Sequence, residues 1–123
     1  MGYIGKLSDE IELMKRYPSD ENRSNYTKIN VWPEGKTPNF QPDQCIAYLE
    51  WHMPKNLKTK AIQIIYSGGS YEGNDPDGFE VAPARRYLNE MGMAVVTLKY
   101  RTPRPKTDLS KHTTAWQDLQ RTI

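Results

Sequence analysis

AIQIIYSGGSYEGN, residues 61–74, changes abruptly from an apolar to a glycine-rich pattern. The first six residues form a short apolar run typical of a buried strand. The run breaks at SGGSY, residues 67–71, where two glycines permit backbone paths that other residues avoid. We call residues 67–71 the glycine loop. The stretch therefore predicts a strand that opens directly into a small loop, where a site could be built.

The segments after the glycine loop alternate between helix and strand. Residues 79–92 are predicted to be a helix, because apolar residues recur at helical spacing at Val81, Ala84, Leu88 and Met91. MAVVTLKY, residues 93–100, is a continuous apolar run and predicts a buried strand. A second helix is expected from Asp108 to the end of the chain, with an inward face made of Ala115, Leu119 and Ile123 and with Trp116 beside it.

The region before the glycine loop is more irregular. Residues 8–17 read as a short helix that Pro18 stops, and KINVW at 28–32 reads as a short strand. CIAYLEWHM at 45–53 predicts a strand by alternation, with Cys45, Ala47, Leu49, Trp51 and Met53 on one face and Ile46, Tyr48, Glu50 and His52 on the other. We therefore divide the chain into an N-terminal helix with a proline-rich lead-in, residues 1–44, and an α/β part, residues 45–123.

The order strand, loop, helix, strand, helix after residue 61 indicates the α/β class, with a parallel sheet and right-handed crossovers. The last predicted helix keeps its helical spacing of apolar residues up to Ile123, and no Gly, Asn or Pro ends it there. Two helices and two parallel strands would make a thin half-structure. The expected architecture is thus part of an α/β sheet, incomplete at its C-terminus.

Composition excludes several classes of function. The chain has 123 residues and a formal net charge of +2, which gives no electrostatic reason to expect nucleic acid or an acidic membrane as partner. Cys45 is the single cysteine, so a disulfide within the chain and a cysteine-based metal cluster are excluded, and a buried inert thiol is expected. The sequence has neither a membrane-length apolar segment nor a signal-peptide core, which leaves a cytoplasmic chain and an exported, trimmed one equally open.

Two nucleotide-binding patterns fail at specific positions of the glycine loop. A phosphate-binding loop needs a lysine directly after its second glycine, and Asn74 follows Gly73 at that point. A dinucleotide fingerprint needs a glycine at the position of Ser70, where backbone must approach the pyrophosphate, and Glu72 would repel that group. No nucleotide cofactor is therefore expected.

An oxyanion loop and a plain tight turn remain as interpretations of the glycine loop. In α/β-hydrolases, one backbone N–H for the oxyanion comes from a glycine-rich loop between a strand and the following helix. Small residues let main-chain N–H groups approach the reacting carbonyl group. The glycine loop fits that template by its placement and composition. In a plain turn the glycines would only supply positive φ angles.

Four segments together resemble the N-terminal part of α/β-hydrolase carbohydrate esterases of the acetyl xylan esterase and feruloyl esterase type, relatives of the prolyl oligopeptidase superfamily. They are VWPEGKTPN (31–39), YSGGSYEG (66–73), the run from ARRY to PRP (84–105) and WQDLQRTI (116–123). The resemblance spans roughly residues 28–123 and is most specific at LKYR (98–101) and QD-x-QR-x-I (117–123). Family members usually carry P-G-G-G-Y or H-G-G-G where this chain has SGGSY.

The resemblance implies a serine esterase that hydrolyses acetyl or feruloyl esters of plant polysaccharide through an acyl-enzyme, without a cofactor or metal. By position, Gly69 and Ser70 would offer the oxyanion N–H groups, and Tyr71 would line the acyl or sugar subsite. A non-catalytic, degenerate hydrolase that acts as a binding or assembly module is the alternative function.

The family's catalytic triad has no match in this chain. The nucleophile belongs on a G-x-S-x-G elbow, and the sequence contains none, so nucleophile, acid and base are expected beyond Ile123. Ser70 is a poor substitute, because the two histidines that could serve as its base, His52 and His112, read as surface or capping residues.

The remaining charged residues have mostly structural interpretations. Asp75 and Asp77 beside Gly78 lack the glutamate of a calcium loop and read as a solvated turn. Arg101 and Arg104 follow a strand end, so they would either contact substrate or neutralise nearby carboxylates. Asp118 and Arg121 are expected to form a surface pair on the last helix.

The strand at 61–66 is expected to lie beside the strand at 93–100. In the family, its other side would hold the nucleophile strand. Without that strand, an apolar edge is exposed, and apolar edges invite pairing with another chain. We therefore expect the chain to associate with a missing C-terminal half or with itself.

Overall fold

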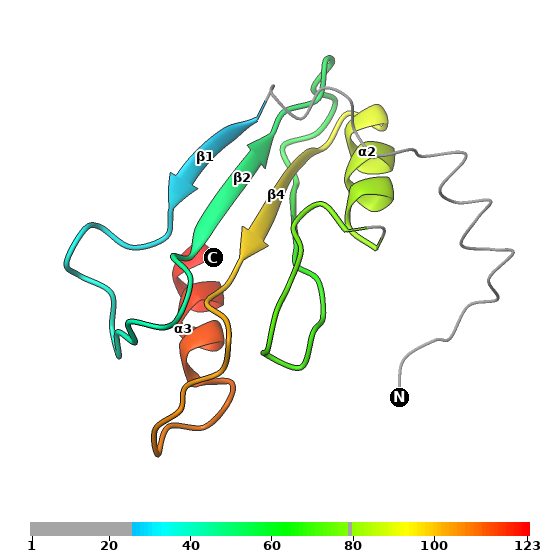
Figure 1. Ribbon diagram of the computed structural model, residues 1–123. Helices are drawn as coiled ribbons and strands as arrows, with labels where there is room; N and C mark the ends of the chain where they lie inside the picture. Colours follow the sequence, from blue (N-terminus) through cyan, green and yellow to red (C-terminus); the bar gives the residue numbers. More distant parts are fainter. Residues whose placement is uncertain (1–25, 79) are drawn as a thin grey trace, which may run out of the picture.

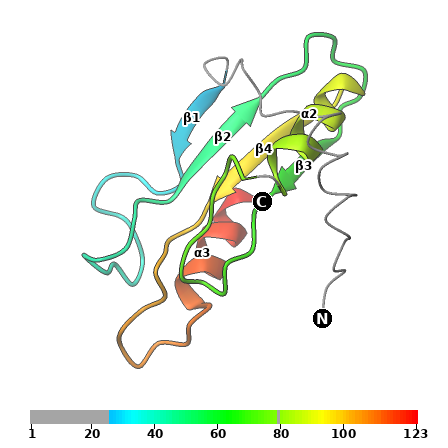
Figure 2. The ribbon, with the colours of Figure 1, turned by 45° about the vertical axis from the view of Figure 1, so that its right-hand side comes forward.

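Four strands form one mixed sheet in the order β1-β2-β4-β3 (Figure 1 and Figure 2). The computed structural model describes residues 26–78 and 80–123. The strands are β1 Thr27–Asn30, β2 Tyr48–His52, β3 Ile62–Ile65 and β4 Ala94–Lys99. The helices are α2 Ala82–Glu90, between β3 and β4, and α3 Thr113–Thr122, after β4. The helix expected at 8–17 lies outside the described residues.

The parallel part of the sheet is limited to β3 and β4. Ile62 pairs with Ala94 and Ile64 with Val96 in a parallel register, as expected for a strand–helix–strand unit. β2 runs antiparallel to both β1 and β4, so the sheet is mixed and not uniformly parallel. Only the segment from β3 to β4 contains the crossover helix that forces parallel strands. The expected neighbour of β3 is confirmed, and β3 lies at an edge of the described sheet.

The core lies between the sheet and α3. Leu98 and Tyr100 pack with Ala115 of α3 and with Val31 and Ala47, which lie in the connection between β1 and β2. Burying apolar surface of this kind contributes about 25 cal/mol per Å². The core therefore fixes α3 against the carboxyl end of β4.

The length of β2 and the burial of its residues differ from the prediction. The strand is shorter than 45–53, and its polar residues are the more buried ones: Glu50 is fully buried and His52 is 4% exposed, with their side chains 3.9 Å apart. Met53, expected on the same face as Leu49, lies beyond the end of β2 and is exposed. The prediction that His52 lies at the surface is wrong, because β2 is an inner strand flanked by β1 and β4.

The predicted inward faces of the two helices are confirmed only in part, since Val81 and Ala115 are buried and Leu119 packs against the core. In α2 the buried residues are Ala82, Pro83 and Arg85, whereas Ala84 and Met91 are exposed. Arg85 is buried because its guanidinium donates to the Pro76 carbonyl and to the Asp77 carboxylate. A charged residue with such partners can occupy a core position that an apolar pattern does not reveal.

α3 begins at Thr113 and not at Asp108. Its buried residues are Thr114, Ala115 and Asp118, and Ile123, predicted to face inward, is 88% exposed. Cys45 is half-buried, with its Sγ 3.6 Å from the Tyr100 carbonyl oxygen. Within the described part of the chain, no helix is long and apolar enough to span a bilayer.

Candidate functional site

The glycine loop leaves the carboxyl end of β3 and reverses in a tight turn. Ser70 and Tyr71 both have positive φ angles, 52° and 66°, and the Glu72 N–H donates to the Gly69 carbonyl at 2.9 Å. Two consecutive left-handed residues closed by this hydrogen bond are typical of a type I′ turn. Positive φ costs a non-glycine residue energy, so Ser70 and Tyr71 hold backbone strain within the loop.

Gly69 occupies a position that only glycine can fill. Its φ is +149°, and a Cβ atom built there would lie 1.7 Å from the Gly73 carbonyl oxygen. A Cβ on the neighbouring Gly68 would meet nothing within 4 Å. The two glycines therefore differ sharply, and the loop's path depends on the second.

Ser67 anchors the start of the glycine loop through two hydrogen bonds. Its backbone carbonyl accepts from the Tyr100 hydroxyl at 2.9 Å, and its Oγ accepts from the Asp75 N–H at 3.0 Å. Lys99 also donates to the Asn74 carbonyl, from the last position of β4. The end of β4 therefore holds both sides of the loop segment 67–75.

A pocket of about 320 Å³ lies between the glycine loop, β4 and α3. It is lined by Tyr66, Ser67, Gly68, Gly69, Ser70, Tyr71, Leu98, Tyr100, Ala115, Trp116 and Leu119. The carboxyl ends of the parallel strands β3 and β4 meet at this pocket, which is where ligands gather in α/β sheets. The lining residues are largely aromatic and apolar, with two serines and the two glycines of the loop beside them.

The backbone N–H groups of Gly69 and Ser70 have no hydrogen-bond acceptor among residues 26–78 and 80–123. Both residues are exposed, so water satisfies these donors in the free protein. Adjacent free N–H groups beside a largely apolar pocket suit an anionic oxygen.

Tyr71 belongs to a cluster of aromatic rings that includes the pocket-lining residues Tyr100 and Trp116. Its ring centroid lies 6.4 Å from those of Tyr100 and His112, and the His112 ring lies 4.0 Å from Trp116. His112 precedes the first turn of α3, as expected for a residue at a helix start, but makes no capping hydrogen bond with its side chain. Tyr71 thus lines the pocket.

The structure does not assemble a catalytic pair around Ser70. In the described part of the chain, the Ser70 side chain has no hydrogen-bond partner. His52 is on β2, which β4 separates from β3, and adjacent strands lie about 4.8 Å apart. His112 packs against aromatic rings.

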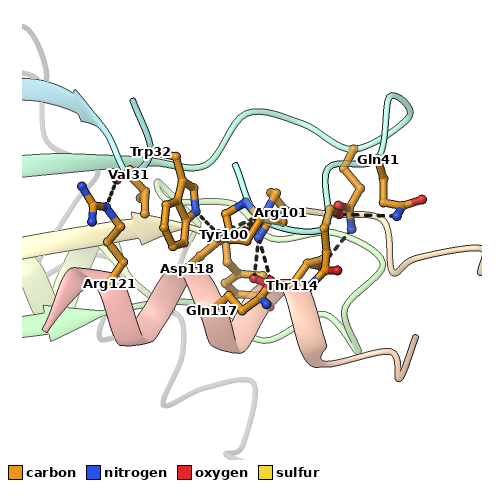
Figure 3. A network of polar contacts seen from close by, with 12 residues as sticks. Val31, Trp32, Gln41, Tyr100, Arg101, Thr114, Gln117, Asp118 and Arg121 are labelled. Carbon is orange, nitrogen blue, oxygen red and sulfur yellow. Dashed lines mark hydrogen bonds and ion pairs between the residues drawn. The ribbon is translucent and has the colours of Figure 1, made fainter. Parts of the chain in front are cut away.

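Arg101 lies in a buried polar network between the end of β4, α3 and the connection between β1 and β2 (Figure 3). Its Nε donates to Asp118 at 3.0 Å, and its other nitrogens donate to the Pro38 carbonyl at 2.7 Å and to the Thr114 carbonyl at 3.3 Å. Its side chain is 3% exposed and does not line the pocket. The geometry gives Arg101 a structural role, with its guanidinium engaged by Asp118 and two backbone carbonyl groups.

Asp118 is the centre of this network and was missed as a site of interest. It is fully buried, accepts from the Arg101 N–H at 2.8 Å and accepts from Trp32 Nε1 at 2.7 Å. The expected surface pair with Arg121 is wrong, since Arg121 instead donates to the Val31 carbonyl. One feature of the sequence indicated that Asp118 is buried. Asp118 follows Ala115 by three residues and therefore lies on the inward face of α3.

The other charged residues near the glycine loop remain at the surface. Arg104 forms an ion pair with Glu72, and both side chains are about half-exposed. The Asp75 carboxylate accepts from the Asp77 N–H within a short turn. Among the described residues, no three His, Cys, Asp or Glu side chains converge as a metal site would require.

Tyr100 links the pocket to an expected pH dependence of stability. Burial raises the pKa of its hydroxyl, and the nearby Tyr71, Glu80 and Tyr66 raise this pKa further. As pH rises through about 10, tyrosine in the unfolded chain loses its proton while folded Tyr100 keeps it. The unfolded state then binds fewer protons, so the free energy of unfolding should fall with rising pH above about 10.

We expect Tyr100→Phe to flatten this alkaline fall, measured as urea midpoints between neutral and alkaline pH. Tyr87→Phe, at an exposed ring, should leave the fall in place. Equal slopes for wild type and Tyr100→Phe would contradict the assignment.

Comparisons with known proteins identify a structural neighbour. No protein-family model matches the chain, and no curated protein matches it. A solved structure, the acetyl ester-xyloside bifunctional hydrolase from Caldicellulosiruptor lactoaceticus, superposes with a TM-score of 0.59 at 21% identity. The match covers 78% of this chain but 34% of the neighbour, so the chain spans about a third of that hydrolase. The chain therefore shares the α/β fold of part of a hydrolase.

Proposed function

We propose that this chain is the N-terminal part of an α/β-hydrolase that acts as a serine esterase, and that the glycine loop supplies its oxyanion donors. The observation that carries the proposal is the glycine loop itself. It leaves the carboxyl end of a parallel strand, requires glycine at position 69, and presents unused N–H groups beside a pocket.

The chemistry assigned to the loop is electrostatic. When a nucleophile attacks an ester carbonyl, negative charge develops on the carbonyl oxygen, and preorganised N–H donors stabilise that charge. The N–H groups of Gly69 and Ser70 would fill this role, and Tyr71 would bound the acyl or sugar subsite. The strain at Ser70 and Tyr71 is consistent with a loop held in one conformation for that purpose.

The substrates proposed are acetyl or feruloyl esters of plant polysaccharide. A pocket of about 320 Å³ bordered by Tyr66, Tyr71 and Trp116 has room for either acyl group. Sugar rings also pack favourably on exposed aromatic faces, because such faces offer apolar area without rotational freedom. The neighbour's acetyl-ester activity is a property of that protein and agrees with this choice.

The expectation that this chain lacks the catalytic nucleophile and base can be tested with the chain alone. We expect purified chain to give no turnover of p-nitrophenyl acetate above buffer and no labelling by a serine-directed fluorophosphonate, because no described residue pairs Ser70 with a base. Turnover that fluorophosphonate blocks would contradict the proposal.

A chimeric enzyme tests whether the glycine loop supplies oxyanion donors. This chain would replace the superposed region of the Caldicellulosiruptor hydrolase, and folding would be checked by circular dichroism. We expect acetyl-ester turnover that Gly69→Ala reduces by about 10²–10³ in kcat, the usual effect of losing an oxyanion donor. Gly68→Ala is the matched control and should retain turnover. A folded chimera in which both substitutions have equal effects would contradict the role of Gly69.

A further inference from the structure

A second, smaller pocket lies beside the connection between β1 and β2. Its volume is about 50 Å³, and its walls come from residues of this connection and from Arg101. We call it the connection pocket. No residue of β3, of the glycine loop or of α3 lines it. In Figure 2 the connection lies on the side of the sheet opposite to β3. The connection pocket is therefore separate from the pocket beside the glycine loop.

Hydrogen bonds hold the walls of the connection pocket in place. Trp32 and Arg101 both line it, and the Asp118 carboxylate accepts from both, at 2.7 Å and 3.0 Å. Arg101 also donates to the carbonyl of Pro38, within the connection itself, at 2.7 Å. Walls that are already ordered lose little conformational freedom when a ligand binds. The connection pocket is thus formed before any ligand arrives.

Gln44 contributes a buried acceptor to this pocket. Gln44 is 9% exposed and lines the pocket, and its Nε2 donates to the Pro103 carbonyl at 2.8 Å and to Thr114 Oγ1 at 3.0 Å. Because a carbonyl group only accepts, the amide nitrogen must face Pro103. The Gln44 Oε1 is then left without a hydrogen-bond partner among residues 26–78 and 80–123. A buried acceptor without a donor is unfavourable, so a donor that enters the pocket is stabilised there.

The other polar groups of the connection pocket favour an uncharged ligand. Thr37 offers a hydroxyl group and Gln41 offers an amide, and both residues are half-buried. Arg101 is the one charged residue in the lining, and its guanidinium is engaged by Asp118 and by backbone carbonyl groups. Hydroxyl and amide groups both donate and accept hydrogen bonds. This set suits the hydroxyl groups of a neutral ligand.

Two exposed apolar side chains border the same pocket. Phe40 is 67% exposed and Ile46 is 72% exposed. Pockets that hold a whole small molecule have volumes of about 300 Å³ or more, so the connection pocket has room for one substituent only. The rest of the ligand would lie over Phe40 and Ile46. A sugar ring has this combination of an apolar C–H face, which packs on an aromatic ring, and hydroxyl groups at its rim.

We propose that the connection pocket is a sugar subsite, in which a sugar ring stacks on Phe40 and one of its hydroxyl groups enters the pocket between Thr37 and Gln44. The choice of a plant polysaccharide as the source of the sugar rests on the proposed function. Tyr100 lines the pocket beside the glycine loop, and the next residue, Arg101, lines the connection pocket, so the two pockets are neighbours at the carboxyl end of β4. One polysaccharide chain then places its acyl group beside the glycine loop and an unsubstituted sugar residue in the connection pocket.

The first test is a titration of the ¹⁵N-labelled chain with xylotetraose, a neutral xylan fragment that carries no ester. We expect saturable shifts of amide signals within residues 37–46. A titration without shifts in this segment would overturn the proposal. Saturable shifts of the same signals with a proline-rich peptide, and none with xylotetraose, would assign the surface to a protein partner and would also overturn it.

A matched pair of substitutions tests the stacking contact. Phe40→Ala should weaken xylotetraose binding by about tenfold, the usual scale for the loss of one aromatic contact. Leu57→Ala also shortens an exposed apolar side chain of a loop, 55% against 67% exposed, and should leave binding unchanged. Circular dichroism would confirm that both variants fold. Equal affinities of Phe40→Ala and the wild type would contradict a sugar ring on Phe40.

An isosteric change tests the hydroxyl recognition. Thr37→Val replaces the hydroxyl group with a methyl group of similar shape, so it removes the hydrogen bond to the sugar without opening a cavity. We expect weaker xylotetraose binding in Thr37→Val, with the stability measured by urea denaturation unchanged. Binding as tight as that of the wild type would overturn the placement of a sugar hydroxyl beside Thr37.

The sugar subsite and the esterase role fail separately. Shifts within residues 37–46 with xylotetraose, combined with Gly69 and Ser70 signals that do not respond to the oxyanion methylphosphonate, would support the subsite and count against the esterase role alone. Responses of Gly69 and Ser70 to methylphosphonate, without any response of residues 37–46 to xylotetraose, would overturn the subsite alone.

Discussion

Replacing Asp118 with alanine is expected to lower the free energy of unfolding by about 3–5 kcal/mol, the usual result of removing one partner of a buried ion pair. The substitution leaves the Arg101 guanidinium, 3% exposed, without its carboxylate. It also removes the acceptor of Trp32 Nε1. Because these three residues join α3, the end of β4 and the connection after β1, the whole pocket region should loosen with them (Figure 3).

Urea denaturation followed by tryptophan fluorescence would measure the effect of Asp118→Ala. Asp108→Ala is the matched control, since Asp108 is an exposed aspartate before α3, and its free energy of unfolding should change by less than about 0.5 kcal/mol. A loss below about 1 kcal/mol in Asp118→Ala would show that the network is not a structural tie between the helix and the sheet.

Replacing Gly69 with alanine is expected to be the most damaging change within the glycine loop. The added Cβ would overlap the Gly73 carbonyl oxygen, so the turn must open. The backbone strain alone should cost about 1–3 kcal/mol. Opening the turn would also displace the N–H groups of Gly69 and Ser70 from the pocket.

Gly68→Ala separates the specific requirement at Gly69 from a general need for small residues. A Cβ there meets nothing within 4 Å, so the stability and the loop conformation should stay close to those of the wild type. Thermal unfolding would report stability, and amide chemical shifts of residues 67–75 would report the conformation of the loop. Equal losses in the two variants would contradict the geometry of the turn.

The elements with strong periodicity or unbroken apolar character could be predicted from the sequence. β4, with its continuous apolar run, and β3, with its break into SGGSY, were placed correctly, and so was the loop between β3 and α2. The antiparallel placement of β2 could not be predicted, because strand pairing depends on contacts between distant segments. The same holds for the exposed positions of Ala84 and Met91 on α2.

Buried charges were the main source of error. Arg85 and Asp118 each occupy an interior position because an ion-pair partner outside their own helix reaches them. His52 is interior because its strand is flanked on both sides by β1 and β4. Periodicity treats such residues as markers of the surface. The anchor between Tyr100 and Ser67 was missed for a related reason, since it joins the ends of two strands 33 residues apart in sequence.

Amide NMR with a tetrahedral oxyanion would show whether the N–H groups of Gly69 and Ser70 form an anion-stabilising pair. The ¹⁵N-labelled chain would be titrated with methylphosphonate and, as a neutral tetrahedral control, with dimethyl sulfone. We expect saturable shifts of the Gly69 and Ser70 signals with methylphosphonate alone, retained in Gly68→Ala and lost in Gly69→Ala. Shifts confined to signals of exposed basic residues such as Arg104, with Gly69 and Ser70 unmoved, would contradict that expectation.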